Sequence, residues 1–129
     1  ADMILALEKM EGLRWTHYLS PRGRLVSADI RINPMTVNTG DAEYPDVDQM
    51  VTAKGIPCTE VPVLSIARRL DNFKVMNVAL LGAASSLIPD ISPDAWEAAI
   101  AERVPGKTLE VNMEAFRQGR AVPHQEVKA

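Results

Sequence analysis

The sequence predicts an α/β fold, with a parallel sheet of about three strands followed by a helical C-terminal half. One observation is the order of elements at the start: a short apolar run at residues 3–7, about a dozen residues with helical spacing, a turn at 20–23 and a second strand-like segment at 24–28. A strand, helix and strand in this order form a crossover unit whose strands pair in parallel. The other observation is that helical spacing dominates after residue 62.

Three short segments have the length of strands, and the first of them is apolar throughout. They are residues 3–7, 24–28 and 56–61. Pro57 and Pro62 flank the third run, which places it near an edge of the sheet, because proline cannot donate a hydrogen bond to a neighbouring strand. A sheet of three strands is thin, so we expect an incomplete domain. Further strands would come from a segment before Ala1 or from a partner subunit.

Apolar positions with helical spacing, bounded by start and stop signals, predict the helices. They cover residues 8–19, 46–54, 63–70, 73–87, 93–104 and 109–118. The helix over 73–87 is apolar nearly all round, so we expect it to be buried on most sides. Thr108 is expected to cap the last helix and Gly119 to end it. Residues 29–45 show no clear period and form a connection long enough to be functional.

Composition excludes several classes of protein and of site. The 129 residues allow one domain, and a hydrophobic content of 47% excludes a disordered chain. The single cysteine excludes a disulfide framework, a cysteine-based zinc site and an iron–sulfur cluster held by this chain alone. The net charge of −3 argues against nucleic acid as the main partner. No apolar run approaches the roughly 20 residues that span a membrane, so we expect a cytoplasmic protein.

Five residues are candidates to face a substrate or a partner. They are Glu8, Glu11, Asn77, Gly82 and Asn112. Glu8 and Glu11 begin the helix after the first strand, at the edge where α/β sheets bind ligands. Alternatively, the two acids stabilise the positive end of that helix.

The other three candidates lie in apolar helical stretches. An amide buried there without a partner would cost roughly 1–3 kcal/mol, so Asn77 and Asn112 either face a ligand or subunit, or tie a helix to nearby backbone. A glycine inside a helix costs roughly 1 kcal/mol against alanine. Gly82 therefore permits either close helix packing or the close approach of a ligand.

No group of residues predicts a catalytic or metal site. His17 and His124 lack the spacing of metal ligands, and Cys58 has no second cysteine to pair with. His17 is expected to be half-buried on a helix face. The acids at Asp41, Glu43, Asp46 and Asp48 have the character of a solvated surface. Phosphate-binding glycine motifs are absent from the sequence. If the chain is part of an enzyme, the catalytic groups and cofactors would therefore lie outside it.

Several segments together resemble a known family. In the first half they are residues 1–8, 11–14, 34–40 and 44–45, and in the second half 72–77, 80–83 and 110–119. The second half combines Asn77 followed by Leu-Gly-Ala with an N-x-x-A-F-x-x-G pattern that starts at Asn112. This set resembles the gamma-type domain of 2-oxoacid:ferredoxin (acceptor) oxidoreductases. The segments at 34–45 and 104–107 are most similar to beta subunits of indolepyruvate ferredoxin oxidoreductases.

The resemblance implies a Rossmann-like domain of which residues 1–122 are the C-terminal part, followed by a flexible tail over 123–129. A glycine-rich strand–loop–helix segment would precede Ala1. The implied reaction is the oxidative decarboxylation of an aryl 2-oxoacid to its acyl-CoA, with electrons passed to ferredoxin. A large partner subunit would hold thiamine diphosphate and the iron–sulfur clusters, and this chain would help to shape the coenzyme A or substrate site without being catalytic alone.

The residues themselves leave a second hypothesis open. A non-enzymatic α/β binding or assembly domain would also carry a thin sheet and an apolar helix. Such a domain could form a homo-oligomer by pairing its exposed sheet edges.

Overall fold

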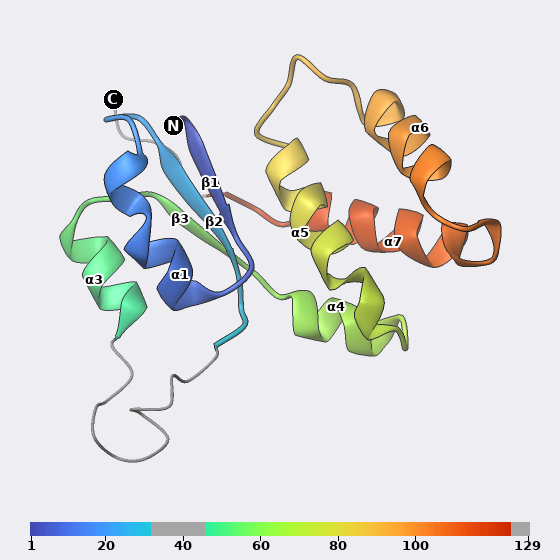
Figure 1. Ribbon diagram of the computed structural model, residues 1–129, viewed down its shortest axis with the longest axis horizontal. Coiled ribbons are helices and arrows are strands. Elements are labelled where there is room, and N and C mark those ends of the chain that lie inside the picture. The colour runs from blue at the N-terminus through green and yellow to red at the C-terminus, as the bar shows by residue number, and fades with distance from the viewer. Residues whose placement is uncertain (32–45, 125–129) are drawn as a thin grey trace. The chain divides into compact units, whose positions relative to one another are not determined.

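The computed structural model describes residues 1–31 and 46–124 in two compact units (Figure 1). The first unit comprises Ala1–Glu60 and His124–Ala129, and the second comprises Val61–Pro123. Most of the predicted connection over 29–45, with Asp41 and Glu43, and the end of the predicted tail lie outside the described residues. The α/β fold is confirmed, because a three-stranded sheet precedes a helical second half.

The sheet consists of β1 (Met3–Ala6), β2 (Arg24–Ala28) and β3 (Cys58–Val61), in the order β1-β2-β3. β1 and β2 are parallel, and Met3 lies opposite Arg24 in their register. The N–H of Leu25 donates to the carbonyl of Pro57 at 2.9 Å, beside the start of β3. The predicted parallel pairing and the edge position of the third strand are confirmed.

Two helices, α1 (Lys9–Arg14) and α3 (Val47–Ala53), pack beside each other against the sheet (Figure 1). The core of this unit contains buried residues from β1, β2 and α3, namely Ala6, Leu25, Val47 and Val51. Gly55 has a φ of 69° and follows the end of α3, as predicted. A φ of this sign is unfavourable for residues with a side chain, so glycine suits the turn.

The helix predicted over 8–19 is wrong in its length, because α1 ends at Arg14 and a 3₁₀ turn, Thr16–Tyr18, follows. The N–H of Trp15 is shared between the carbonyls of Glu11 and Gly12, both at 3.3 Å, which tightens the helix into the 3₁₀ form. His17 is consequently exposed rather than half-buried, and its ring lies 4.2 Å from the ring of Tyr18.

The second unit contains four helices and two 3₁₀ turns. In chain order these are α4 (Val63–Arg69), the turn Phe73–Val75, α5 (Met76–Ser85), α6 (Pro93–Arg103), the turn Gly106–Thr108 and α7 (Leu109–Arg120). α5 and α7 cross in close contact, and buried side chains of α4, α5 and α7 form the core. The largest of these are Ile66, Leu80 and Phe116. No helix in the described ranges is long and apolar enough to cross a membrane.

Several helix boundaries differ from the sequence predictions. Asn72 accepts the N–H of Lys74 at 2.9 Å and begins a 3₁₀ turn, so α5 starts only at Met76. Thr108 does not cap α7, because its hydroxyl donates to the carbonyl of Pro105 at 3.0 Å. Gly119 does not end α7 either, since it lies within the helix and is buried. Ser92 caps α6 as expected and accepts the N–H of Ala95 at 3.1 Å.

Candidate functional site

The carboxyl end of β1 carries two of the predicted site residues. Glu8 is buried, and its carboxylate accepts the N–H of Glu11 at 2.8 Å, so it caps the first turn of α1. Glu11 is exposed and forms an ion pair with Arg14 at 3.1 Å. Both acids therefore support α1 electrostatically, which is the alternative that the sequence left open. A role of either acid toward a ligand remains a prediction.

A hollow of about 280 Å³ opens between β1 and α1. Its lining is mostly apolar and comprises Ile4, Leu5, Ala6, Leu7, Glu8, Glu11, Gly12 and Trp15. Gly12 permits α1 to approach the strand, because a Cβ on it would lie 2.9 Å from the Cβ of Ala6. We call this feature the β1-edge hollow. It could receive an apolar group, and its two acids lie at one end of the strand.

Lys9 links α1 to two other elements of the first unit. Its Nζ lies 2.7 Å from Glu60 on β3 and 3.5 Å from Asp48 on α3. Burial lowers the pKa of Lys9, but the hydrogen bond and charge of Glu60 and the charge of Asp48 outweigh it, so the pKa lies above its ordinary value. The ammonium group of Lys9 therefore joins α1 to α3 and β3 through ion pairs. With its raised pKa, Lys9 is unsuited to act as a base at neutral pH.

Cys58 lies at the start of β3 and is partly buried. Burial, together with the negative charges of Asp48 and Glu60, raises the pKa of this thiol to about 11 despite the nearby Lys9. A neutral thiol is a poor nucleophile and a poor metal ligand. Residues 1–31 and 46–124 contain no group of three His, Cys, Asp or Glu side chains placed to hold a metal ion.

The three remaining predicted site residues lie in the second unit, in different environments. Asn77 is exposed near the start of α5, so the expectation of a buried amide is wrong: the first turn of α5 reaches solvent. Asn112 is buried, and its Nδ2 donates to the carbonyl of Thr108 at 2.9 Å, within the first turn of α7. This bond ties the amide to nearby backbone, as the structural alternative proposed.

Gly82 is buried where α5 crosses α7. A Cβ on Gly82 would collide with the carbonyl oxygen of Phe116 and lie 3.0 Å from the backbone nitrogen of Arg120. The glycine therefore permits close packing of the two helices. A Cβ on Gly119 would in turn collide with the backbone of Ala79. This second contact was not predicted from the sequence, although small residues recur at helical spacing on both helices.

Arg120 adds a polar bond to the same crossing. Its Nη1 donates to the hydroxyl of Ser85 at 2.9 Å, and Ser85 donates to the carbonyl of Gly82 at 2.6 Å. Ser85 is fully buried, so its hydroxyl is satisfied within the unit. The residues at the crossing of α5 and α7 therefore serve the packing of these two helices.

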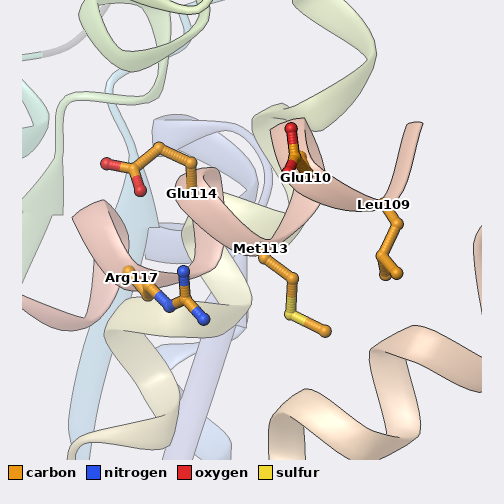
Figure 2. A pocket seen from close by; sticks show the side chains of 5 residues that line it. All are labelled: Leu109, Glu110, Met113, Glu114 and Arg117. Carbon is orange, nitrogen blue, oxygen red and sulfur yellow. The ribbon is translucent and has the colours of Figure 1, made fainter. Parts of the chain in front are cut away.

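A second hollow, of about 480 Å³, lies on the surface of α7 (Figure 2). It is lined by Leu109, Glu110, Met113, Glu114 and Arg117. Figure 2 shows the apolar Leu109 and Met113 on one side of the helix and the carboxylates of Glu110 and Glu114 on the other. Arg117 donates through Nε to Glu97 of α6 at 2.7 Å. The lining of this hollow combines charged and apolar side chains and includes no thiol, hydroxyl or imidazole group.

The pattern of the pyruvate ferredoxin/flavodoxin oxidoreductase family matches residues 1–122. The chain belongs to this family. The match covers both compact units except for the last residues of the chain, so the gamma-type resemblance noted in the sequence is confirmed.

Curated relatives from several organisms carry the same name. The chain is 36% identical over 126 residues to the indolepyruvate oxidoreductase subunit IorB of Thermococcus kodakarensis. Identity is 33% over 129 residues to the subunit of that name in Pyrococcus horikoshii and 28% over 126 residues to that in Archaeoglobus fulgidus. Each comparison covers 92% of this chain and 61% of the relative. The chain thus spans about three fifths of the length of these relatives.

Proposed function

We propose that this chain is part of a subunit of an indolepyruvate ferredoxin oxidoreductase. In the proposed reaction an aryl 2-oxoacid anion and coenzyme A give the acyl-CoA, CO₂ and a proton, and two electrons pass to ferredoxin. The observation that carries the proposal is the family match over residues 1–122, supported by relatives that are all named indolepyruvate oxidoreductase subunits. The cytoplasm is the proposed location.

The residues of this chain do not fit the redox cofactors that such a reaction needs. An iron–sulfur cluster takes about four cysteine thiolates, and the chain contains one cysteine, whose pKa is raised to about 11. The described residues also offer no group of three acidic or imidazole side chains for a metal that would accompany a diphosphate. We therefore propose that a large partner subunit holds thiamine diphosphate and the clusters.

The proposed contribution of this chain is to the surface that meets the partner or coenzyme A. Among the five predicted site residues, Glu11 and Asn77 are exposed and available for such contacts. Glu8, Gly82 and Asn112 already serve the capping and packing of helices. We propose Glu11 and Asn77 as the better candidates to face a ligand or subunit.

Reconstitution of the complex tests this function. The complete subunit is mixed with the large subunit, thiamine diphosphate and coenzyme A, and the reduction of a viologen dye is followed with indolepyruvate as the substrate. We expect dye reduction that requires both subunits and coenzyme A. A large subunit that is fully active alone would show that the subunit role is wrong.

The exposed apolar residues near β1 favour a second candidate function, that of an assembly domain without catalysis. Leu7 and Trp15 are 63% and 48% exposed, and such residues gathered at one place are typical of interaction sites. Sedimentation of the complete subunit separates the candidates. A stable monomer that binds no large subunit excludes the assembly domain and the oxidoreductase subunit alike, whereas a homo-oligomer without dye reduction supports the assembly domain.

A further inference from the structure

The turn between α4 and α5 gathers exposed cations and an exposed aromatic ring. Arg68 and Arg69 lie in the last turn of α4, and Phe73 and Lys74 belong to the 3₁₀ turn that leads into α5. All four residues are exposed, and Asn77 is exposed one helical turn further along the chain. The 3₁₀ turn contacts both α4 and α5, so these residues lie in one region of the second unit (Figure 1). We call the surface formed by these five residues the α4–α5 corner.

Backbone hydrogen bonds fix the shape of this corner. The N–H of Asn72 donates to the carbonyl of Ala67 at 3.0 Å, and the N–H of Asp71 donates to the carbonyl of Arg68 at 3.2 Å. These two bonds end α4 in a Schellman motif, in which Asp71 takes the left-handed conformation with a φ of 52°. The backbone that presents the exposed side chains is therefore already ordered, which lowers the free-energy cost of a contact.

The charge of the corner is unbalanced. Its three cations form no ion pair with any residue in 1–31 or 46–124. Residues 68–77 contain a single acid, Asp71, although the whole chain has a net charge of −3. A positive region on an otherwise acidic chain is complementary to a negatively charged surface of another molecule.

Support of the helix ends explains only part of this pattern. Cations in the last turn of a helix stabilise its negative end, which accounts for Arg68 and Arg69. It does not account for Lys74, which lies beside the positive end of α5, or for Phe73, which is 54% exposed. Arginine and aromatic side chains are together typical of the energetically important part of protein interfaces.

We infer that the α4–α5 corner docks against an acidic face of the large partner subunit. Phe73 enters an apolar recess of that face, and Arg68, Arg69 and Lys74 pair with carboxylates around it. Neither of the two hollows described above includes a residue of the corner, which favours a protein surface over a small ligand as the occupant. The inference rests on the proposed function, because that function supplies the partner subunit.

A matched pair of charge reversals in the complete subunit tests the electrostatic part of this contact. The test variant combines Arg69→Glu with Lys74→Glu. The control combines Arg103→Glu with Lys107→Glu, since it also changes one arginine in the last turn of a helix and one lysine in a 3₁₀ turn of the same unit. All four residues are exposed, so both variants should fold, and their Tm values check this.

The Kd for the large subunit is the readout of this pair. We expect it to rise at least about 10-fold for the test variant and less than about 3-fold for the control. The wild-type association rate should fall steeply between about 50 and 500 mM salt, and that of the test variant should fall less. Equal Kd values or equal salt dependence for the two variants overturn the inference.

Phe73→Ala tests the apolar anchor without changing any charge. Ile91→Ala is its control, because Ile91 is a 41% exposed apolar residue of the same unit. We expect Phe73→Ala to raise the Kd for the large subunit at least about 10-fold at low and high salt alike, whereas Ile91→Ala should change it less than about 3-fold. Equal effects of the two changes contradict an anchor at Phe73.

The same variants identify the partner and separate this inference from the proposed function. Wild-type Kd values for both corner variants, in a complex that reduces the dye, overturn the inference and leave the proposed function intact. An unchanged Kd together with a raised KM for ferredoxin would assign the corner to the electron acceptor and overturn the large subunit as its partner. A wild-type subunit that neither binds the large subunit nor supports dye reduction contradicts the proposed function and, with it, the partner assigned to the corner.

Discussion

Gly82 and Gly119 decide how closely the backbones of α5 and α7 can approach. Each glycine lies against backbone atoms of the opposite helix, and a Cβ at either position would collide with a carbonyl oxygen. A flexible side chain could move away from an added methyl group, but a helix backbone cannot do so without shifting the whole element. The two positions are thus set by packing, and no ligand is needed to explain them.

The first prediction concerns Gly82. We expect Gly82→Ala to lower the free energy of unfolding by about 3 kcal/mol or more, because the added Cβ overpacks a buried crossing. Chemical denaturation of the variant measures the change. Gly106→Ala is the control, since nothing lies within 4 Å of the Cβ that it adds. Equal losses for the two variants would show that α5 and α7 do not require the glycine.

The second prediction separates stability from function at Asn77. Because this side chain is exposed, Asn77→Leu should change the free energy of unfolding by less than about 0.5 kcal/mol. Asn112→Ala, which removes the bond to the carbonyl of Thr108, should cost about 1 kcal/mol. If Asn77 faces a ligand or subunit, its variant weakens dye reduction or subunit binding at unchanged Tm. Wild-type values in all three measurements would remove Asn77 from the site.

The third prediction concerns the reactivity of Cys58 with pH. A thiol with a pKa of about 11 instead of 9.0 should react with iodoacetamide at pH 8 about 100-fold more slowly than an exposed thiol. The fold favours the neutral form, so this contribution to stability is complete below pH 9 and is lost as the pH rises through about 11. Alkylation rates between pH 7 and 11, compared with those in urea, measure the shift. A folded rate that is already maximal at pH 9 would contradict it.

At the scale of elements, the sequence predicted what depends on local signals. β2 has the predicted bounds, and α3 ends shortly before Gly55, because strand patterns and helix stop signals act over a few residues. The prediction for Gly119 was wrong for a different reason. A glycine near the end of a helical pattern is typical of a helix stop, but Gly119 lies within α7 and packs against the backbone of α5. α1 ends earlier than predicted because the N–H of Trp15 is shared between the carbonyls of Glu11 and Gly12. The spacing of apolar residues carries no signal for this hydrogen-bond pattern.

The candidate site was predictable to a smaller degree than the fold. Glu8 could be placed at the end of the first strand, and its capping role follows from that place. The β1-edge hollow could not be predicted, because it depends on how closely Gly12 brings α1 to the strand. The burial of Asn112 and the exposure of Asn77 depend on which face of each helix meets the core, and both stretches are apolar on several sides.

The fourth prediction concerns the attachment of α6. Among the described residues, α6 contributes one buried side chain, that of Ile100, whereas α5 and α7 each contribute several. The contacts of α6 with α7 include the ring pair of Trp96 and Phe116, 6.4 Å apart, and the ion pair of the partly exposed Glu97 with the exposed Arg117. We therefore expect amides in α6 to exchange at a lower opening free energy than those in α5 and α7. Equal exchange of the three helices would show that they open as one unit.

At the scale of the whole molecule, the distribution of apolar surface links the fold to assembly. Seven large hydrophobic side chains are exposed in the described ranges, and four of them belong to the first 18 residues. They are Leu5, Leu7, Trp15 and Tyr18. Leu5, Leu7 and Trp15 line the β1-edge hollow, and Tyr18 stacks on Trp15 with ring centroids 5.6 Å apart. Because the net charge of the chain is only −3, we expect this apolar surface, rather than electrostatic attraction, to promote association with another protein surface.

The last prediction therefore concerns self-association of the 129-residue chain. We expect its sedimentation coefficient to rise with concentration, because association covers the exposed apolar residues at β1. Replacing Leu7 and Trp15 by glutamate should shift the chain toward the monomer, since burying a charge in an apolar contact is unfavourable. Both side chains are about half exposed or more, so the Tm should change little.

Phe73→Glu is the matched control, because Phe73 is 54% exposed and lies in the other unit. Association that responds to Phe73→Glu but not to the paired change would place the contact on the second unit, and a wild-type chain that stays monomeric would contradict the prediction outright.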